Sequence, residues 1–486
     1  MVWFAGISGQ AQTPFIQSVK SEHDWRIPVY GPPAGDPFVE KEVLVNGRDA
    51  VQRGQDFLVK FNLSGGFFSP QSANLTNGVL IGVILSGLVL RFIYPFWTNP
   101  LDFLFSDMRT LWLASRDDSD TAFMYLRIPI LYEWYLSFIR WISGDSRTFI
   151  AFSTAMMSVL TPFFYWRAAR SLNFSVTKAL FVFALITWTP SFFGIFTYFV
   201  NETLLLTMTG LALWMSGRHL KYGGVFNFAV ASVCWTLASM TKASIVPVAG
   251  VALFYTWLVH DRKFKSAAIG LVIGVLLLTP NAVRTYKAFG FMAPLGFSTS
   301  VAIEHMSGAR TLRLNWKDRV WVNSTPSAYM RPLEPFSGWM MDRAGKQDVY
   351  ELNIDASKGK ADWDRAYNEV NYNFGIWAKQ QWENTILLFF APSWPDGDKS
   401  TLPGLLQYWS RYMWAPIIIF VLYGNARLLL EKKFPLLPML TTLFFFFLLF
   451  QPWATMEGRY RKPLEPLLLM NAVFLSGRRK QATATV

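Results

Sequence analysis

The chain has 486 residues, of which 52% are hydrophobic and only 16% are charged, against about 25% charged residues in ordinary soluble domains. This composition excludes a single soluble core, because soluble chains of this length divide into domains with polar surfaces. The net charge of +13 does not indicate nucleic-acid binding, since no zinc-finger, recognition-helix or aromatic RNA-binding pattern is present. Uncharged stretches long enough to cross about 30 Å of hydrocarbon instead indicate an integral membrane protein.

Residues 1–75 form a polar N-terminal region rich in Pro and Gly, to which the sequence assigns no function. The pieces EVLV and DFLVKF favour strands, and the Asn46-Gly47 pair between them favours a hairpin turn. The region contains no apolar stretch of the kind found in signal peptides, so none is expected. The one cysteine, Cys234, lies in an apolar stretch. Because one cysteine cannot form an intrachain disulfide, cysteine content does not indicate the redox compartment of the protein.

Hydropathy predicts about ten membrane-spanning helices, which makes the fold class an all-α polytopic membrane protein with a long extracytoplasmic loop domain. Basic connections such as GRHLKYGG and DRKFK all fall on one side under this count. The positive-inside rule makes that side the cytoplasm, where both termini are then expected. The expected spans are residues 77–97, 147–166, 179–196, 200–216, 225–240, 243–259, 266–283, 409–428, 434–451 and 463–476.

The spans divide the chain beyond the N-terminal region into three parts. Residues 76–283 form a transmembrane core with its first outer loop at 98–146, residues 284–408 form an extracytoplasmic domain, and residues 409–486 form the last spans and a cytoplasmic tail. The extracytoplasmic domain contains ADWDRAYNEVNYNFGIWAKQQW, a pattern that favours a helix lying on the membrane surface. No internal repeat is visible, which counts against a transporter, since many transporters are built from repeats.

The first outer loop carries Asp107 near the start of an expected helix, SDMRTLWLASR. One interpretation is a helix start, because Ser106 can cap and an acid in the first turn suits the helix dipole. The other is a carboxylate at the outer membrane surface that takes a proton from a hydroxyl. The later acids Asp117, Asp118 and Asp120 favour a solvated turn.

Several charged residues lie at the outer ends of the expected spans. Arg127 precedes an aromatic helix and is either an anchor reaching the headgroups or a ligand for a phosphate. Lys242 and Arg284 interrupt apolar sequence on the outer side, where an unpaired cation is costly, so a lipid-borne anion is an expected partner. Glu202 lies at the mouth of two spans and is either solvated or functional.

The segment MEGRYRKPLEPLLLM places Glu457, Arg459, Arg461 and Lys462 directly before the last span, again on the outer side. A local break of the positive-inside rule, in a chain that otherwise follows it, indicates a site. An acid near several cations that can bind phosphate is typical of a transferase that uses a lipid-phosphate donor.

Six segments, taken in chain order, resemble those of the polyprenyl-phosphate-sugar-dependent membrane glycosyltransferases of the GT-C class, a group that includes protein O-mannosyltransferases and the lipid A aminoarabinose transferase. The segments are SDMRTLWLASR, RIPILYEWYL, YFVNETLLL, LASMTKASIV, TPNAVRTYKAFGFMAPL and MEGRYRKPLEPLLL. The resemblance covers residues 77 to about 476 and is specific to the superfamily, not to one substrate. Two features depart from it: Arg127 stands where relatives often carry His or Lys, and residues 1–75 have no counterpart.

The resemblance implies an inverting transfer from a polyprenyl-phosphate sugar on the extracytoplasmic face, with the first-loop Asp as base. The catalytic residues are therefore expected to be Asp107 and Glu202. The expected donor phosphate ligands are Arg127, Lys242, Arg284, Arg459 and Arg461. No cofactor is required, although Asp107 and Glu202 could bind a divalent metal.

The expected protein is thus a hexosyl or pentosyl transferase of a bacterial inner membrane, with its site facing outward. Its expected partners are a polyprenyl-phosphate-linked sugar, a glycan, lipid or protein acceptor, and membrane lipids, with no nucleic acid. Two alternatives stay open. A transporter or flippase of a lipid-linked sugar would carry its charges near the bilayer midplane, and a non-catalytic homologue would only bind polyprenyl phosphate.

Overall fold

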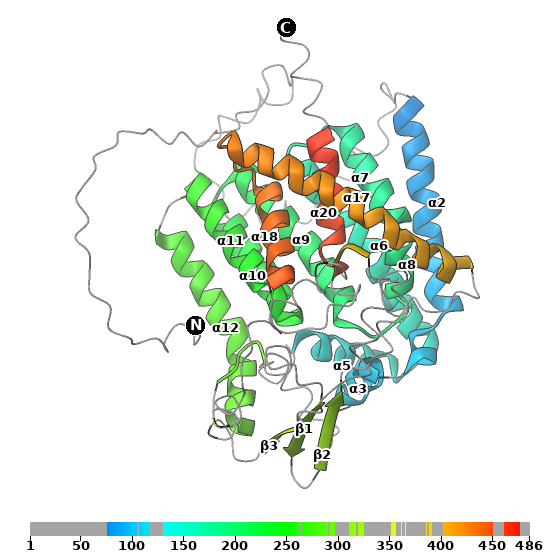
Figure 1. Ribbon diagram of the computed structural model, residues 1–486, viewed down its shortest axis with the longest axis vertical. Coiled ribbons are helices and arrows are strands. Elements are labelled where there is room, and N and C mark those ends of the chain that lie inside the picture. Colours follow the sequence, from blue (N-terminus) through cyan, green and yellow to red (C-terminus); the bar gives the residue numbers. More distant parts are fainter. Residues whose placement is uncertain are drawn as a thin grey trace, which may run out of the picture. The chain divides into compact units, whose positions relative to one another are not determined.

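The computed structural model describes the membrane region and parts of its loops (Figure 1). By contacts the chain divides into Met1–Val45 and Asn46–Val486, and every described residue belongs to the second unit. The expected strands and hairpin turn of the N-terminal region lie outside the described residues. The described residues are 75–104, 106–116, 130–261, 264–289, 292–296, 311–316, 319–324, 351–355, 402–450 and 461–476, with isolated positions between 361 and 390.

Helices build the described membrane region, which confirms the predicted all-α polytopic fold. Each expected span coincides with a helix, except that residues 179–196 form two. On length and composition alone, five helices of the described part can cross a membrane. The helices are α2 (Leu75–Trp97), α6 (Arg147–Ser171), α7 (Val176–Trp188), α8 (Ser191–Ile195), α9 (Asn201–Tyr222), α10 (Val225–Thr241), α11 (Val246–Thr256), α12 (Phe264–Phe289), α17 (Leu402–Leu430), α18 (Leu436–Phe450) and α20 (Glu465–Ser476).

The outward faces of these helices are apolar, as lipid contact requires. On α2, Val79 is 59% exposed and Val89 is 56% exposed, whereas Arg91 on the same helix is buried. On α12, Leu271 and Leu276 are likewise exposed. This inversion of the soluble pattern is expected where the surrounding solvent is hydrocarbon and polar groups need partners within the protein.

Close helix packing depends on small residues between α6 and α9. A side chain at Gly217 would place its Cβ 2.0 Å from Ser171 Oγ, so only glycine allows this approach. Thr161 and Thr207 share a hydrogen bond of 2.6 Å across the same interface. Small residues and interhelical hydroxyl contacts are the usual means of joining helices in membranes.

The expected span 179–196 is broken rather than continuous. Thr189 takes an extended conformation and Pro190 follows it, so α7 ends at Trp188 and the short α8 begins at Ser191. Proline cannot donate the helical hydrogen bond, and it disfavours the helical conformation of the residue before it. The sequence prediction missed this break because the surrounding residues carry no charge and their hydropathy is continuous.

Arg91 donates hydrogen bonds to backbone carbonyl groups that lack a helical partner because α7 ends at the break. Its guanidinium donates to the carbonyl oxygens of Ile186 and Thr187, each at 2.8 Å. The helices α2 and α7 can approach this closely because of Gly87, where a Cβ would lie 2.5 Å from the Thr187 side chain. The arginine therefore joins the first span to the broken third.

In its described residues, the first loop, between α2 and α6, contains three short helices: η2 (Pro100–Phe103), α3 (Ser106–Ala114) and α5 (Leu131–Ser143). They lie at the end of the bundle where α2 stops and α6 starts, since Asn99 Nδ2 donates to the carbonyl oxygen of Arg147 at 3.0 Å. We call this end of the helix bundle, where α2 stops and α6 starts, the first-loop end. In Figure 1, α3 and α5 lie below α8 and α9.

The long loop between α12 and α17 contains a small sheet that the sequence analysis did not anticipate. Strand β1 (Thr311–Trp316) pairs antiparallel with β2 (Arg319–Ser324) and parallel with β3 (Glu351–Asp355), in the order β2-β1-β3. The predicted surface helix at ADWDRAYNEVNYNFGIWAKQQW lies outside the described residues, apart from the isolated helical positions Ala361 and Arg365.

Candidate functional site

Glu202 and Lys242 form an ion pair at the first-loop end. Glu202 lies in the first turn of α9 and is 3% exposed. Lys242 directly follows α10 in an extended conformation, before the 3-10 turn η3 (Ala243–Ile245). Its Nζ donates to Glu202 Oε1 at 2.6 Å. The sequence predicted both residues at this end, and the structure brings their side chains together.

The environment of this pair suits a carboxylate. The N-terminus of a helix carries partial positive charge, which stabilises an acid in its first turn. The ammonium group of Lys242 neutralises the carboxylate, and 18% of the Lys242 side chain is exposed against 4% for Glu202. An anionic ligand can therefore reach the lysine but would share it with Glu202.

Arg284 forms a second pair at the same end. Its Nη1 lies 3.0 Å from Glu133 Oε2, which joins the last turns of α12 to the first turn of α5. The Arg284 side chain is 27% exposed, so it too is accessible. Sequence reasoning predicted Arg284 but missed Glu133, whose only signal was an acid within the aromatic stretch YEWYL.

The helix predicted to carry Asp107 is present. Helix α3 begins at Ser106, which places Asp107 in its first turn, although the side chain of Asp107 lies outside the described atoms. The helix packs inward through Met108, Leu111 and Trp112, all buried. A helix starts here as expected, and both roles considered for Asp107, the helix-start acid and the catalytic base, stay predictions.

The described end of the C-terminal basic segment, from Arg461 on, is buried. Arg461 is 1% exposed, and its Nε donates to Glu465 Oε1 at 2.9 Å. Glu465 Oε2 accepts from Ser191 Oγ at 2.8 Å, and Lys462 donates to the carbonyl oxygen of Ser191. This network ties the start of α20 to the broken span. Sequence reasoning missed Glu465 and Ser191, although the spacing of Arg461 and Glu465 by four residues on a helix was a signal.

Two predicted phosphate ligands, Arg127 and Arg459, lie outside the described residues. So does the acidic run of Asp117, Asp118 and Asp120, and so does Glu457. Within the described residues, no three His, Cys, Asp or Glu side chains come together as they would at a metal site.

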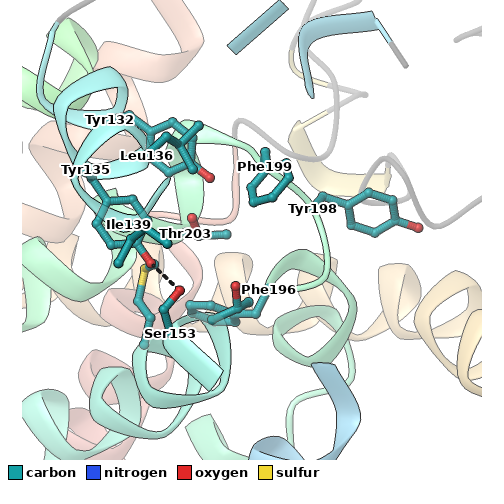
Figure 2. A pocket seen from close by; sticks show the side chains of 11 residues that line it. Tyr132, Tyr135, Leu136, Ile139, Ser153, Phe196, Tyr198, Phe199 and Thr203 are labelled. Atoms are coloured by element: carbon teal, nitrogen blue, oxygen red, sulfur yellow. Dashed lines mark hydrogen bonds between the residues drawn. The ribbon is translucent and has the colours of Figure 1, made fainter. Parts of the chain in front are cut away.

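A small cavity of about 10 Å³, which is room for about one water molecule, lies beside the start of α9. Tyr132 and Tyr135 of α5, Phe196 before α9 and Thr203 on α9 line it, as Figure 2 shows. The ring of Tyr198 points away from this group (Figure 2).

The phenols of this cavity are neutral at physiological pH. Burial raises the pKa of Tyr132 well above its usual value, with a smaller contribution from Tyr135. Burial also raises the pKa of Tyr135 to about 12, although a hydrogen bond with Ser153 opposes the shift. The hydroxyl of Tyr135 lies 3.4 Å from Ser153 Oγ (Figure 2). These groups can therefore hydrogen-bond a neutral ligand group or water but do not supply a base.

Comparison with known proteins supports a transferase. Residues 127–283 match the family model of dolichyl-phosphate-mannose-protein mannosyltransferases. Over this segment the chain is therefore similar to membrane glycosyltransferases of the GT-C type. The matched segment is about a third of the sequence and runs from before α5 to within α12, so that it includes Glu133, Glu202 and Lys242. No curated protein and no solved structure matches the chain.

Proposed function

We propose that the chain transfers a sugar from a polyprenyl-phosphate donor to an acceptor hydroxyl at the first-loop end, on the extracytoplasmic face of the membrane. The observation that carries this proposal is the pairing of two accessible cations, Lys242 and Arg284, with the buried Glu202 and the partly exposed Glu133, beside the helix that holds Asp107. The family match supplies the transferase class, and a lipid phosphate is the anion that such cations would bind at a membrane surface.

The reaction assigned to these residues is an inverting displacement. Asp107 takes the proton of the acceptor hydroxyl, whose oxygen attacks the anomeric carbon. The bond between that carbon and the phosphate oxygen breaks, and polyprenyl phosphate leaves with the bonding electrons. The sugar is a hexosyl or pentosyl group, and the acceptor is a glycan, lipid or protein.

The cations act on the leaving phosphate. Lys242 and Arg284 can approach it directly, because both side chains are partly exposed. Arg127 and Arg459 are proposed as further ligands on their position in the sequence. Arg461 would act from inside the protein, since it is already paired with Glu465. Preorganised donors of this kind contribute about 3 to 4 kcal/mol each to the stability of a transition state.

No metal ion is required in this proposal, because the cations face the charge that develops on the phosphate. Asp107 and Glu202 define the place where a divalent ion would bind if one took part. Activity measured with and without a chelator, followed by readdition of Mg²⁺ or Mn²⁺, decides between the two cases.

An enzyme fits the placement of charge better than a flippase does. The pairs Glu202–Lys242 and Arg284–Glu133 lie at the ends of their helices rather than midway along them. A carrier that exposes its ligand to each side in turn is expected to bind it near the midplane. The non-catalytic alternative is separated from the enzyme by the assay below.

The test is the Asp107→Asn variant, assayed with polyprenyl-phosphate sugars in detergent or vesicles. Loss of a general base lowers rates by about 10² to 10⁴, whereas Asn retains the size and capping ability of Asp. The matched controls are the single Asn variants at Asp117, Asp118 and Asp120, which should keep most of the activity. Transfer at near wild-type rate by a folded Asp107→Asn protein would leave Asp107 only the role of an acid at a helix start, and Glu202 would become the better candidate for the base.

A further inference from the structure

Three planar groups contact one another within the first-loop end. The guanidinium of Arg140, on α5, lies 3.8 Å from the centre of the Trp112 ring, on α3. Trp112 also stacks on Phe199, whose ring centre is 4.9 Å away with an angle of only 10° between the planes. The stack therefore connects α5 to α3 and α3 to the segment that leads into α9.

Arg140 also holds the end of α3 through hydrogen bonds. Its Nη1 donates to the carbonyl oxygen of Trp112, and to Ser115 Oγ at 2.8 Å. Only 5% of the Arg140 side chain is exposed. A carbonyl in the last turn of a helix has no hydrogen-bond donor within that helix. Here Arg140 of α5 is the donor to the Trp112 carbonyl oxygen.

Asp145 completes the arrangement by holding Arg140 through two oxygens. Arg140 Nε lies 2.7 Å from Asp145 Oδ1, and Nη2 lies 3.0 Å from Oδ2. Arg116, which follows α3, pairs with the same carboxylate. A two-point contact of this kind defines the orientation of the guanidinium as well as its position.

The backbone at Asp145 takes an uncommon conformation that fits such a role. Gly144 has φ +56° and Asp145 has φ +64°, so two successive residues are left-handed. Aspartate tolerates this region better than most residues but still adopts it infrequently. Ser143 Oγ accepts from the Asp145 backbone N–H at 3.1 Å, which supports the turn. Uncommon backbone conformations persist where the surrounding contacts impose them, and they cluster at functional sites.

The Phe199 end of the stack lies beside the other proposed site residues. Phe199 precedes α9, whose first turn holds Glu202 and with it Lys242. Helix α3 holds Asp107 in its first turn and Trp112 in its last. The stack is thus the contact through which the helix of the proposed base meets the segment of the proposed ion pair.

We propose that Arg140, Trp112 and Asp145 form a positioning unit that sets the place of Asp107 relative to the Glu202–Lys242 pair. The inference rests on the proposed function and adds to it three residues that touch neither donor nor acceptor. A displacement of about 1 Å in a reacting group can lower a rate about 10²-fold. The unit should therefore govern the rate of transfer and leave donor binding nearly unchanged.

The experiment compares Arg140→Met, Arg140→Lys, Trp112→Leu and Trp112→Phe with Arg147→Met in the full-length protein. Arg147 forms an exposed pair with Asp102 in the same region, with Nη2 to Oδ1 at 2.8 Å, and serves as the matched control. We expect Arg140→Met and Trp112→Leu to lose about 10² in kcat with less than about a 3-fold change in KM for the donor. Arg140→Lys and Trp112→Phe should recover part of kcat, and Arg147→Met should behave as wild type.

A distance measurement keeps the inference testable if a variant is unstable. Spin labels at the exposed positions Arg109 on α3 and Trp141 on α5, in a Cys234→Ala background, report the separation of the two helices. The milder Asp145→Asn variant keeps the left-handed turn, since Asn also tolerates it, but loses the charge. A wider distance distribution with lowered kcat supports the positioning unit, and an unchanged distribution with wild-type kcat overturns it.

The experiments distinguish a failure of the positioning unit from a failure of the proposed function. If Asp107→Asn is inactive while Arg140→Met and Trp112→Leu keep kcat within about 2-fold of wild type, the positioning unit is wrong and the proposed function stands. A rise of about 10² in the KM for the donor with unchanged kcat also overturns the positioning unit, because the residues would then act on donor binding. If Asp107→Asn itself transfers sugar normally, the proposed function fails first.

Discussion

Lys242 reaches from the end of α10 to Glu202 at the start of α9, with 2.6 Å between Nζ and Oε1. The pair joins two expected spans at the end where the donor is proposed to bind. Because the carboxylate is nearly buried and the lysine is partly exposed, the pair has one side that faces the protein and one that an anion can approach. This relationship makes Lys242 both a structural partner and a candidate ligand, and the two roles require separate tests.

Replacing Lys242 with Met should weaken the binding of polyprenyl phosphate and also lower stability. The loss of one partner of a buried pair costs about 3 to 5 kcal/mol because the other charge is left uncompensated. The double variant Lys242→Met/Glu202→Gln removes that charge and should recover most of the stability without recovering lipid-phosphate affinity. Thermal unfolding and a lipid-phosphate binding assay measure the two effects. Wild-type affinity in the double variant would mean that Lys242 serves only as the counter-ion of Glu202.

Replacing Glu133 with Gln should strengthen the binding of the donor phosphate. The carboxylate neutralises Arg284 at 3.0 Å and repels a second anion, so its removal leaves the guanidinium available. An increase in affinity of up to about 10-fold corresponds to about 1.4 kcal/mol, which is within the range of a partly exposed charge pair. The matched variant Arg284→Met should bind more weakly. A loss of affinity in Glu133→Gln would show instead that Glu133 orients Arg284 for the phosphate.

The ion pairs around Asp145 should weaken in acid. Hydrogen bonds from Arg140 hold the pKa of Asp145 below its usual value, and those from Arg116 add to the effect. An acid with a lowered folded-state pKa contributes stability above its unfolded pKa of about 3.9 and loses that contribution as pH falls through the folded pKa. The difference in unfolding temperature between wild type and Asp145→Asn should therefore shrink as pH falls below about 4. A difference that stays constant down to about pH 2 would contradict the ion pairs.

The predicted orientation is tested by cysteine labelling in a Cys234→Ala background. Positions Arg167, Arg218 and Lys263 are expected in the cytoplasm, and position Trp316 is expected outside. A membrane-impermeant reagent should label a cysteine at 316 in intact cells and label the other three only after permeabilisation. Labelling at 316 only after permeabilisation would reverse the topology and move the first-loop end to the cytoplasmic side.

The sequence predicted the helices of the membrane region well because lipid imposes a simple rule on spanning segments. A stretch without charge and long enough to cross hydrocarbon must satisfy its backbone internally, and a helix does so. The prediction went wrong where one proline acts on its neighbours: Pro190 breaks a stretch whose hydropathy is continuous. It also missed strands β1, β2 and β3, because short strands in a long polar loop leave little pattern to detect.

The candidate site was predictable in composition but not in pairing. Lys242 and Arg284 stood out because each broke the expected distribution of basic residues. Glu202 was also predicted, but not as the partner of Lys242, from which it is separated by 40 residues. Glu133 did not stand out, because it is separated from Arg284 by 151 residues. Arg140 and Trp112 gave no signal at all, since an arginine and a tryptophan are ordinary in a short helix near a membrane surface.

Arg91 has a consequence for how the chain is made. Its hydrogen-bond acceptors come from residues 67 to 101 positions later in the chain. An arginine near the middle of a lone spanning helix costs about 2.5 to 3.5 kcal/mol on insertion. When α2 leaves the ribosome, the oxygens that offset this cost have not yet been synthesised. The first span therefore acquires its final depth and rotation only after α6, α7 and α8 have emerged, so the docking of α2 must wait until the chain has been made as far as Ile195.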